Sequence, residues 1–360
     1  MSLMRRAGKA IAWLVGLSMV ALALILSPIG YVELFCTAEP QPQEPARFIE
    51  PRWQRSEAAT FLTYPEWHIV YAYEDMAEIL RDGDEHDFAY LPSVAGFWSS
   101  YCALNRKAQA HGGGTIETRG MIYVIGVSFT IEMALKALYE ETIGRVAVIV
   151  RGETKTVEDF VAADMAERYA QFLRQTPWYR YPFEEEIDRL NAAGGSSLRS
   201  VERSMALMLE WRAKQAYARL IEMAAAANGA AALEIHSAVD GIAPSDLSGI
   251  TDIAVVGTRD EGPTIIRTPR YRRFTEILQA MSSNGASIVE IAGNDDILVS
   301  VVHDDASEPL PDGGEVLTRM RRQGFADHRS LVALKVERVS AYMRELEARS
   351  GARLEHVYDY

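Results

Sequence analysis

An uncharged, strongly apolar run near the N-terminus constrains this chain more than any other feature. It extends from Ala10 to Val32, about 23 residues, which as an α-helix measures roughly 34 Å and can cross the ~30 Å hydrocarbon core of a bilayer. Cationic residues precede the run, and glutamates are the first charges after it. The positive-inside rule therefore predicts a cytoplasmic segment 1–9, a single transmembrane anchor over residues 10–35, and an exported body.

A cleaved signal peptide is the alternative interpretation of this segment. Cys36-Thr37-Ala38 has the small residues typical of a cleavage site, whereas the apolar run exceeds the 7–15 residues usual for a signal sequence. We therefore expect an uncleaved anchor. Cleavage would leave the body on the same side of the membrane.

The chain contains two cysteines, Cys36 at the outer end of the predicted anchor and Cys102 in a predicted helix. In an oxidising compartment they could form a disulfide that ties the body to the anchor. Two separate, partly buried thiols are the other possibility, because cysteine is among the most buried residue types. The sequence alone leaves both open.

Composition places the remainder of the chain among folded proteins. Of 360 residues, 48% are hydrophobic, which is enough to form a core and to divide into two domains. The formal charge of −13 argues against a general nucleic-acid binder, because phosphate backbones are held by clustered lysine and arginine. We expect no nucleic-acid partner and no cofactor.

The apolar periodicity changes once along the body and so predicts an α+β protein with two parts. A proline-rich linker covers residues 36–55, an all-α domain covers 56–229, and a small α+β domain with a largely antiparallel sheet covers 230–360. The predicted helices are 63–80, 93–110, 120–143, 156–176, 197–227, 271–281 and 327–349. Capping-box patterns at Thr63-x-x-Glu66 and Thr156-x-x-Asp159 mark the starts of the first and the fourth of these helices. The predicted strands are 233–239, 252–256, 264–267, 286–291 and 297–302, with a hairpin turn at residues 294–296.

The helix predicted for residues 120–143 is the most apolar region after the anchor. Its charge-free part covers only about 12 residues, fewer than the roughly 20 needed to cross a bilayer. We therefore expect a buried helix of the soluble core.

Three segments of the helical half carry a resemblance to known proteins: FLTYPEWHIVY at 61–71, FWSSYC at 97–102 and IGVSFTIE at 125–132. They resemble signatures of an uncharacterised family of proteobacterial membrane-anchored proteins. The resemblance covers residues 56–185 and implies a location in the bacterial cell envelope. Together with the topology predicted from the charges, we expect the anchor in the inner membrane and the body in the periplasm. It implies no activity and no catalytic residue.

A polar stripe on the first body helix is the main candidate for acid–base chemistry. His68, Tyr71, Asp75 and Glu78 stand at i, i+3, i+7 and i+10 and so face one direction. A solvated helix face gives the same pattern. The chain has no H-E-x-x-H or Glu-x-x-His motif and no metal-spaced Cys/His pair, so we expect no metal site.

Glu132, Lys136 and Glu140 recur at i+4 on the apolar helix that follows. They form either a buried functional cluster or ordinary intrahelical ion pairs. His68, Asp75 and Glu132 are therefore the candidate catalytic residues, should the protein be an enzyme.

The segment 177–183 is the best candidate for binding, because its seven residues include four aromatic residues and two prolines. Aromatic residues beside an arginine are typical of protein-contact hot spots and of membrane interfaces. A loop pinned to the core is the alternative. The candidate binding residues are Trp178, Tyr179, Arg180 and Tyr181.

Three further patterns invite weaker interpretations. The acidic loop 82–87 departs from the EF-hand pattern, because Asp87 stands at the position of the turn glycine. His111 opens an H-G-G-G segment like the oxyanion loop of esterases, but no G-x-S-x-G elbow follows it. Arginines gather at 267–273, in a region that is acidic overall.

Two hypotheses for function remain from the sequence. The first is a membrane-tethered binding or assembly protein of the bacterial cell envelope, held by the N-terminal helix and contacting an envelope protein partner. The second is an envelope enzyme with an unrecognised His/carboxylate site, because residues from distant segments can assemble into a site that one sequence does not reveal.

Overall fold

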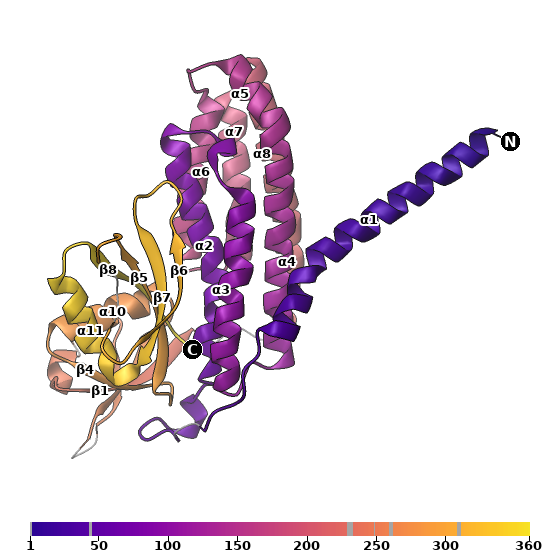
Figure 1. Cartoon of the computed structure of the whole chain (residues 1–360). Coiled ribbons are helices and arrows are strands. Elements are labelled where there is room, and N and C mark those ends of the chain that lie inside the picture. The colour runs from indigo at the N-terminus through magenta and orange to yellow at the C-terminus, as the bar shows by residue number, and fades with distance from the viewer. Residues whose placement is uncertain (1, 43–44, 229–232, 248, 259–261, 308–310) are drawn as a thin grey trace.

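A computed structural model describes the chain except for residues 1, 43–44, 229–232, 248, 259–261 and 308–310. A long N-terminal helix projects from a bundle of helices, and a domain with two sheets packs against the other side of that bundle (Figure 1). The fold is α+β, as the change in apolar periodicity predicts.

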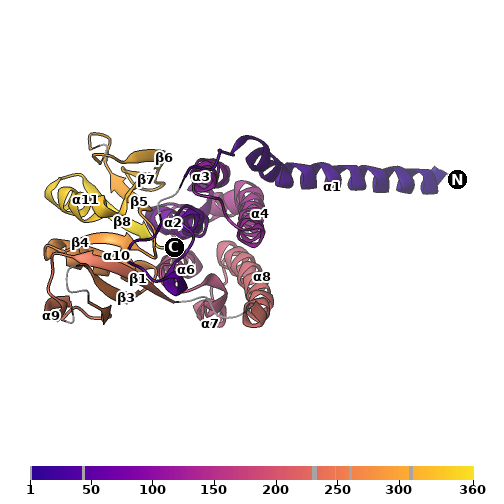
Figure 2. The ribbon, with the colours of Figure 1, turned by 90° about the horizontal axis from the view of Figure 1, so that it is seen from below.

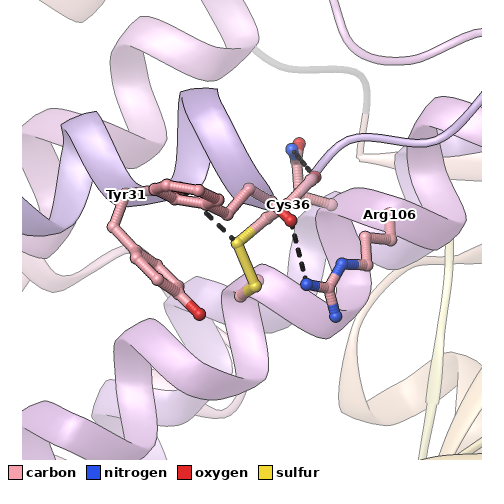
Figure 3. Close-up of a disulfide and its surroundings, with 6 residues drawn as sticks. Tyr31, Cys36 and Arg106 are labelled. Atoms are coloured by element: carbon pink, nitrogen blue, oxygen red, sulfur yellow. Dashed lines mark hydrogen bonds between the residues drawn. A yellow bond between two sulfur atoms is a disulfide. The ribbon is translucent and has the colours of Figure 1, made fainter.

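The projecting helix α1 (Ser2–Phe35) is long and apolar enough to cross a membrane over Val15–Phe35. A disulfide joins Cys36, the residue after α1, to Cys102 in α3 (Figure 3). Beside it, Arg106 donates to the carbonyl oxygen of Phe35 at 2.9 Å. Of the two possibilities for the cysteines, the structure thus has the disulfide. This bond links α3 of the body to the end of α1.

The linker that follows is extended, as its prolines predict, but it is docked on the body. The buried carboxylate of Glu290 accepts the backbone N–H groups of Arg47, Phe48 and Ile49 at 2.7–3.3 Å. The short turn η1 (Pro51–Trp53) then places Trp53 on His236, with ring centroids 4.2 Å apart. Because one carboxylate accepts hydrogen bonds from three successive backbone N–H groups, the contact between the linker and Glu290 is specific.

The bundle contains the helices expected from the apolar spacing, together with short elements that the spacing does not reveal. They are α2 (Ala58–Asp82), η2 (Glu85–Asp87), α3 (Tyr90–Ala110), α4 (Ile116–Tyr139), the π-helical turn η3 (Glu140–Gly144), α5 (Arg145–Arg151), α6 (Val157–Leu173), η4 (Trp178–Arg180), α7 (Phe183–Ala193) and α8 (Leu198–Asn228).

Two predicted helix starts have different outcomes. The side chains of Thr156 and Asp159 form a capping box at the start of α6, as predicted. The capping box predicted at Thr63 is wrong, because α2 already begins at Ala58 and Thr63 donates to the carbonyl of Ala59 inside the helix. Burial of Phe61 extends α2 by a turn ahead of its proline.

Within the described residues, the C-terminal strands form two antiparallel four-stranded sheets. Sheet A has the order β2-β3-β1-β4 and sheet B the order β6-β7-β5-β8. The strands are β1 (Glu234–Asp240), β2 (Ala254–Gly257), β3 (Thr264–Pro269), β4 (Ser287–Ile291), β5 (Asp296–His303), β6 (Glu315–Arg321), β7 (His328–Lys335) and β8 (Ala352–Tyr358). The helices are α9 (Pro244–Leu247), α10 (Arg272–Ser283) and α11 (Val336–Ala348).

Two predictions for this domain are wrong. The chain turns near Asn294, but β4 and β5 belong to different sheets and form no hairpin. The first part of the predicted helix 327–349 is strand β7, which pairs with β5 and β6 at the centre of sheet B. Its residues are buried on both faces, so the apolar run lacks the alternation that identifies a strand.

Sheet B and the bundle share one hydrophobic core. Leu298 and Leu331 of sheet B lie in the same buried cluster as Phe61, Phe97 and the other bundle residues. The hydroxyl groups of Tyr71 in α2 and Tyr358 in β8 are 3.1 Å apart. The α2 helix is therefore a structural element of both parts of the body.

The outer side of α4–α5 and of the first half of α8 is apolar and exposed. This side, the α4–α8 face, carries Ile116, Met121, Val124, Ile131, Leu135, Leu138, Ile143, Val146, Ile149 and Val150 of α4–α5, and Leu198, Val201, Met205 and Leu209 of α8. The prediction of a buried core helix at 120–143 is wrong, because only 22% of the most apolar stretch in Ile116–Arg151 is buried. Hydropathy gives the composition of a helix but not what covers it.

Candidate functional site

The aromatic segment 177–183 lies between α6 and α7, against α8. Tyr181 and Phe183 are buried, and the Tyr181 hydroxyl donates to the Glu186 carboxylate at 2.7 Å. Trp178 is half-buried and stacks on Tyr217 of α8, with ring centroids 5.3 Å apart. The segment is thus pinned to the core at its C-terminal end and partly open at η4, so each of the two predicted interpretations describes one half of it.

A groove of about 440 Å³ opens beside this segment, between α7 and α8. Two of the four predicted binding residues, Tyr179 and Tyr181, line it, while Arg180 is exposed at the turn. The remaining lining residues are Pro182, Phe183, Glu184, Glu185, Asp188, Gln215, Ala218, Arg219 and Glu222. The groove thus combines aromatic walls with four carboxylates and one guanidinium.

The sequence predicts only the wall of this groove that the aromatic segment 177–183 forms. The wall from α8, Gln215 to Glu222, comes from a helix whose composition gives no binding signal, and tertiary packing brings it opposite α7. A volume of this size falls within the range of ligand clefts in proteins. Its carboxylates favour a cationic ligand.

His68 is buried in the bundle and makes structural contacts. Its Nε2 donates to the carbonyl oxygen of Ser93 at 3.0 Å, and its Nδ1 faces the Tyr64 hydroxyl at 3.4 Å. The edges and faces of Phe97 and Phe129 surround the ring. Burial lowers the pKa of His68 to about 4, so the imidazole is neutral at physiological pH.

Asp75 lies at the junction between α2 and the loop after β6. One carboxylate oxygen accepts the backbone N–H of Gln323 at 2.9 Å, and the other has no hydrogen-bond partner. Burial raises the pKa of Asp75 to about 7, against the opposing effect of the Arg329 guanidinium. A carboxyl group with this pKa suits acid–base work, but its side chain is closed off from solvent.

Glu132 belongs to a layer of charged residues between α4 and α8. Its carboxylate accepts the Tyr73 hydroxyl and lies 3.0 Å from Lys214 Nζ. Lys136 pairs with Glu210 at 2.9 Å. The interpretation of these residues as intrahelical ion pairs is therefore wrong for Glu132 and Lys136, because both pair across the bundle with α8.

The same layer continues toward the loops at the far end of the bundle. The guanidinium of Arg203, 1% exposed, contacts the carboxylates of Glu85, Glu140 and Glu202 at 2.7, 2.8 and 3.2 Å. Arg199 lies one helical turn away and bridges Glu85 to further carboxylates. Buried charges of both signs satisfy one another along the bundle.

Among the residues that the structure describes, two clusters have the geometry of a cation site, and a protein cation lies at each. Asp84, Glu85 and Asp159 surround Arg151 and Arg199, which accounts for the acidic loop 82–87.

The second cluster joins His111 of the H-G-G-G segment to Glu57 and Asp296. His111 Nδ1 lies 3.1 Å from Glu57 Oε2, and Lys335 Nζ lies 2.7 Å from Asp296 Oδ2. Glu57 Oε1 also accepts the backbone N–H of Asp296 at 2.8 Å. The cluster fastens the end of α3 to sheet B, a role that the sequence did not reveal.

The structure does not bring the candidate catalytic residues together. His68 contacts aromatic rings of α3 and α4, Asp75 contacts the loop after β6, and Glu132 contacts Tyr73 and α8. The arginines of 267–273 make ion pairs, for example Arg270 with Asp359 and Arg273 with Asp252, instead of forming a patch for phosphate.

No protein-family model, no curated protein and no solved structure matches this chain. The resemblance of residues 56–185 to a family of proteobacterial membrane-anchored proteins stays a prediction.

Proposed function

We propose that this protein is a membrane-tethered binding or assembly protein of the bacterial cell envelope, with a single-pass anchor in the inner membrane and its body in the periplasm. The observation that carries the binding role is the open acidic and aromatic groove between α7 and α8. The partner we propose is a cationic segment of another envelope protein, because four carboxylates face one guanidinium in the groove.

The tether rests on α1 and on its rigid connection to the body. Trp13 and Tyr31 are exposed near the two ends of the apolar run in α1, about 27 Å apart at 1.5 Å per residue, a spacing that suits aromatic residues at both membrane interfaces. The Cys36–Cys102 disulfide supports an oxidising compartment outside the cytoplasm. Cationic residues before the apolar run of α1 support a cytoplasmic N-terminus.

An envelope enzyme with a His/carboxylate site is the alternative, and Asp75 is its best candidate because of its raised pKa. Burial of Asp75 and the separate surroundings of His68 and Glu132 give this alternative less support than the groove. A bound metal or small molecule in the purified protein would favour it.

Site-specific photocrosslinking in living cells tests the binding role. A photoreactive amino acid at Tyr179 should form a covalent adduct with a partner protein, and the same probe at Ala348 on α11, outside the groove, should not. Asp188→Lys should abolish the adduct, whereas the matched charge reversal Glu337→Lys on α11 should leave it. Absence of an adduct at Tyr179, or equal effects of the two reversals, would contradict the proposal.

Fusion reporters test the topology. A C-terminal alkaline phosphatase fusion should be active and a C-terminal green fluorescent protein fusion dark, because the body is placed in the periplasm. The opposite pair of results would place the C-terminal domain in the cytoplasm. It would then follow that α4–α5 crosses the membrane as a second span.

A further inference from the structure

The α4–α8 face has the surface of a membrane-embedded protein. Between Gly120 and Leu138, a stretch that the structure describes without a gap, every exposed residue is glycine, alanine, valine, isoleucine, leucine or methionine. Leu135 and Leu138 of α4 are 63% and 67% exposed, and Leu209 of α8 is 75% exposed. Contiguous apolar surface of this kind is rare on soluble monomers and marks a contact with lipid or protein.

The interior behind this face contains ion pairs beside apolar side chains such as Phe129 and Trp211. Lys136 and Glu132 of α4 point toward α8, where they pair with Glu210 and Lys214 at 2.9 and 3.0 Å. Between Gly120 and Leu138, the charged residues of α4 thus face the neighbouring helix while its exposed residues are apolar, which reverses the placement usual in a water-soluble bundle. Charged residues within membrane bundles likewise face the interior and pair with one another.

The position of α1 indicates which partner covers the face. At the end of α1, Glu33 accepts the Tyr123 hydroxyl of α4 at 2.5 Å and lies 3.4 Å from Arg119. From this contact, α1 and α4–α5 both extend toward the same end of the molecule (Figure 1). Seen from below, α4 and α8 lie on the side from which α1 projects, and the sheets lie on the opposite side (Figure 2).

A bilayer crossed by α1 would therefore meet the α4–α8 face. Tyr31 is 54% exposed near the end of α1 and suits the headgroup region, at the level where α4 contacts the anchor. From its contact with α1, α4 extends toward the same end of the molecule as the anchor, while the two helices diverge (Figure 1). A bilayer that α1 crosses would place the apolar side chains of α4 and of the first half of α8 at the depth of the acyl chains.

We infer that the α4–α8 face is seated in the outer leaflet of the bilayer that α1 spans, with lipid acyl chains as its occupant. The body is then a partly immersed bundle, held by two elements, and not a domain that floats on a tether. The inference rests on the proposed membrane tether and is independent of the groove between α7 and α8.

Lipid quenching of a fluorophore tests this placement in the full-length protein. Both native cysteines are in the disulfide, so a single introduced cysteine carries the probe. The test positions are Leu135→Cys and Leu209→Cys on the face. Leu22→Cys in α1 reports on the anchor, and Ala348→Cys on α11, on the opposite side of the molecule, is the aqueous control.

Each labelled protein is reconstituted in phosphatidylcholine vesicles that contain a nitroxide-labelled phospholipid. Probes at residues 22, 135 and 209 should be quenched by the nitroxide lipid at least twofold more than the probe at residue 348, and iodide should quench only the probe at 348. Quenching at 22 without quenching at 135 and 209 would overturn the inference and leave the tether standing.

The other outcomes are equally decisive. Quenching at 135 and 209 but not at 22 would support the face and refute the tether. Protection of 135 and 209 from both quenchers, with probe-to-probe self-quenching, would identify a second copy of the chain as the occupant and overturn the lipid assignment.

Discussion

Replacing Arg203 with alanine tests whether the charged layer inside the bundle is a connected structural unit. The guanidinium of Arg203 is buried and contacts the carboxylates of Glu85, Glu140 and Glu202 within 3.2 Å. Its removal takes from Glu140 the guanidinium that it contacts, and it leaves Glu85 and Glu202 sharing Arg199 in the interior. Because stranded buried charges cost more than the lost attraction alone, we expect Arg203→Ala to lower the free energy of unfolding by about 3–5 kcal/mol.

The measurement is thermal unfolding of the full chain in detergent micelles, followed by circular dichroism at 222 nm. At about 2–3 °C per kcal/mol for a body of this size, the expected loss corresponds to a fall in Tm of roughly 6–15 °C. The matched control is Arg212→Ala, an exposed arginine on the same helix, which should change Tm by less than about 1 °C.

A double variant shows whether the loss comes from stranded charge. Adding Glu85→Gln to Arg203→Ala neutralises one of the three carboxylates, so part of the lost stability should return and the two changes should not be additive. A fall in Tm no larger than that of Arg212→Ala, or strict additivity of Arg203→Ala and Glu85→Gln, would refute the reasoning.

Four further substitutions probe other parts of the structure. Cys36→Ser removes the disulfide to Cys102, which lies 66 residues further along the chain, and should lower the free energy of unfolding by roughly 2–4 kcal/mol in thermal unfolding. Thiol labelling of the denatured wild type should find no free thiol. The folded-state pKa of Asp75 is raised from 3.8 to about 7, so the stability due to its neutral form is complete below pH 4 and is lost as pH rises through 7. Asp75→Asn should therefore stabilise the protein at pH 8, by at most about 4 kcal/mol of unfolding free energy, and should have almost no effect on stability at pH 4. An equal rise in Tm at pH 8 and at pH 4 would contradict the raised pKa. Trp178→Ala should cost only about 1–2 kcal/mol because Trp178 is half-buried, whereas Tyr181→Ala should cost about 3–5 kcal/mol, and equal losses in chemical denaturation would show that the two side chains are packed alike.

The sequence predicts one wall of the groove between α7 and α8, the aromatic segment 177–183, but not the wall formed by α8. The two prolines and four aromatics of 177–183 identified a segment that cannot be regular helix, and Tyr179 and Tyr181 do line the groove. Which half of the segment is buried depends on Tyr217 and on α8. These residues lie more than 30 positions further along the chain, so no local pattern connects them.

The sequence by itself determined the features that follow from local chemistry. The uncharged run at Ala10–Val32 is apolar over a full bilayer width, the capping box at Thr156 starts a helix, and the change of period after residue 229 separates helices from strands. Each of these depends on residues within a few turns of one another, whose spacing is fixed by backbone geometry.

Only the tertiary structure decided which side of each element is covered and by what. The helix at 120–143 has the hydropathy of a core element, yet α8 covers its charged side and leaves its apolar side exposed, and the strand at 328–335 loses its alternation because sheet B is buried on both faces. The charges of α4 pair with residues of α8 that lie 74 and 82 positions away in the chain, and Cys36 pairs with Cys102. Burial and pairing depend on distances in space between segments that are far apart in sequence, and such distances exist only once the chain has folded.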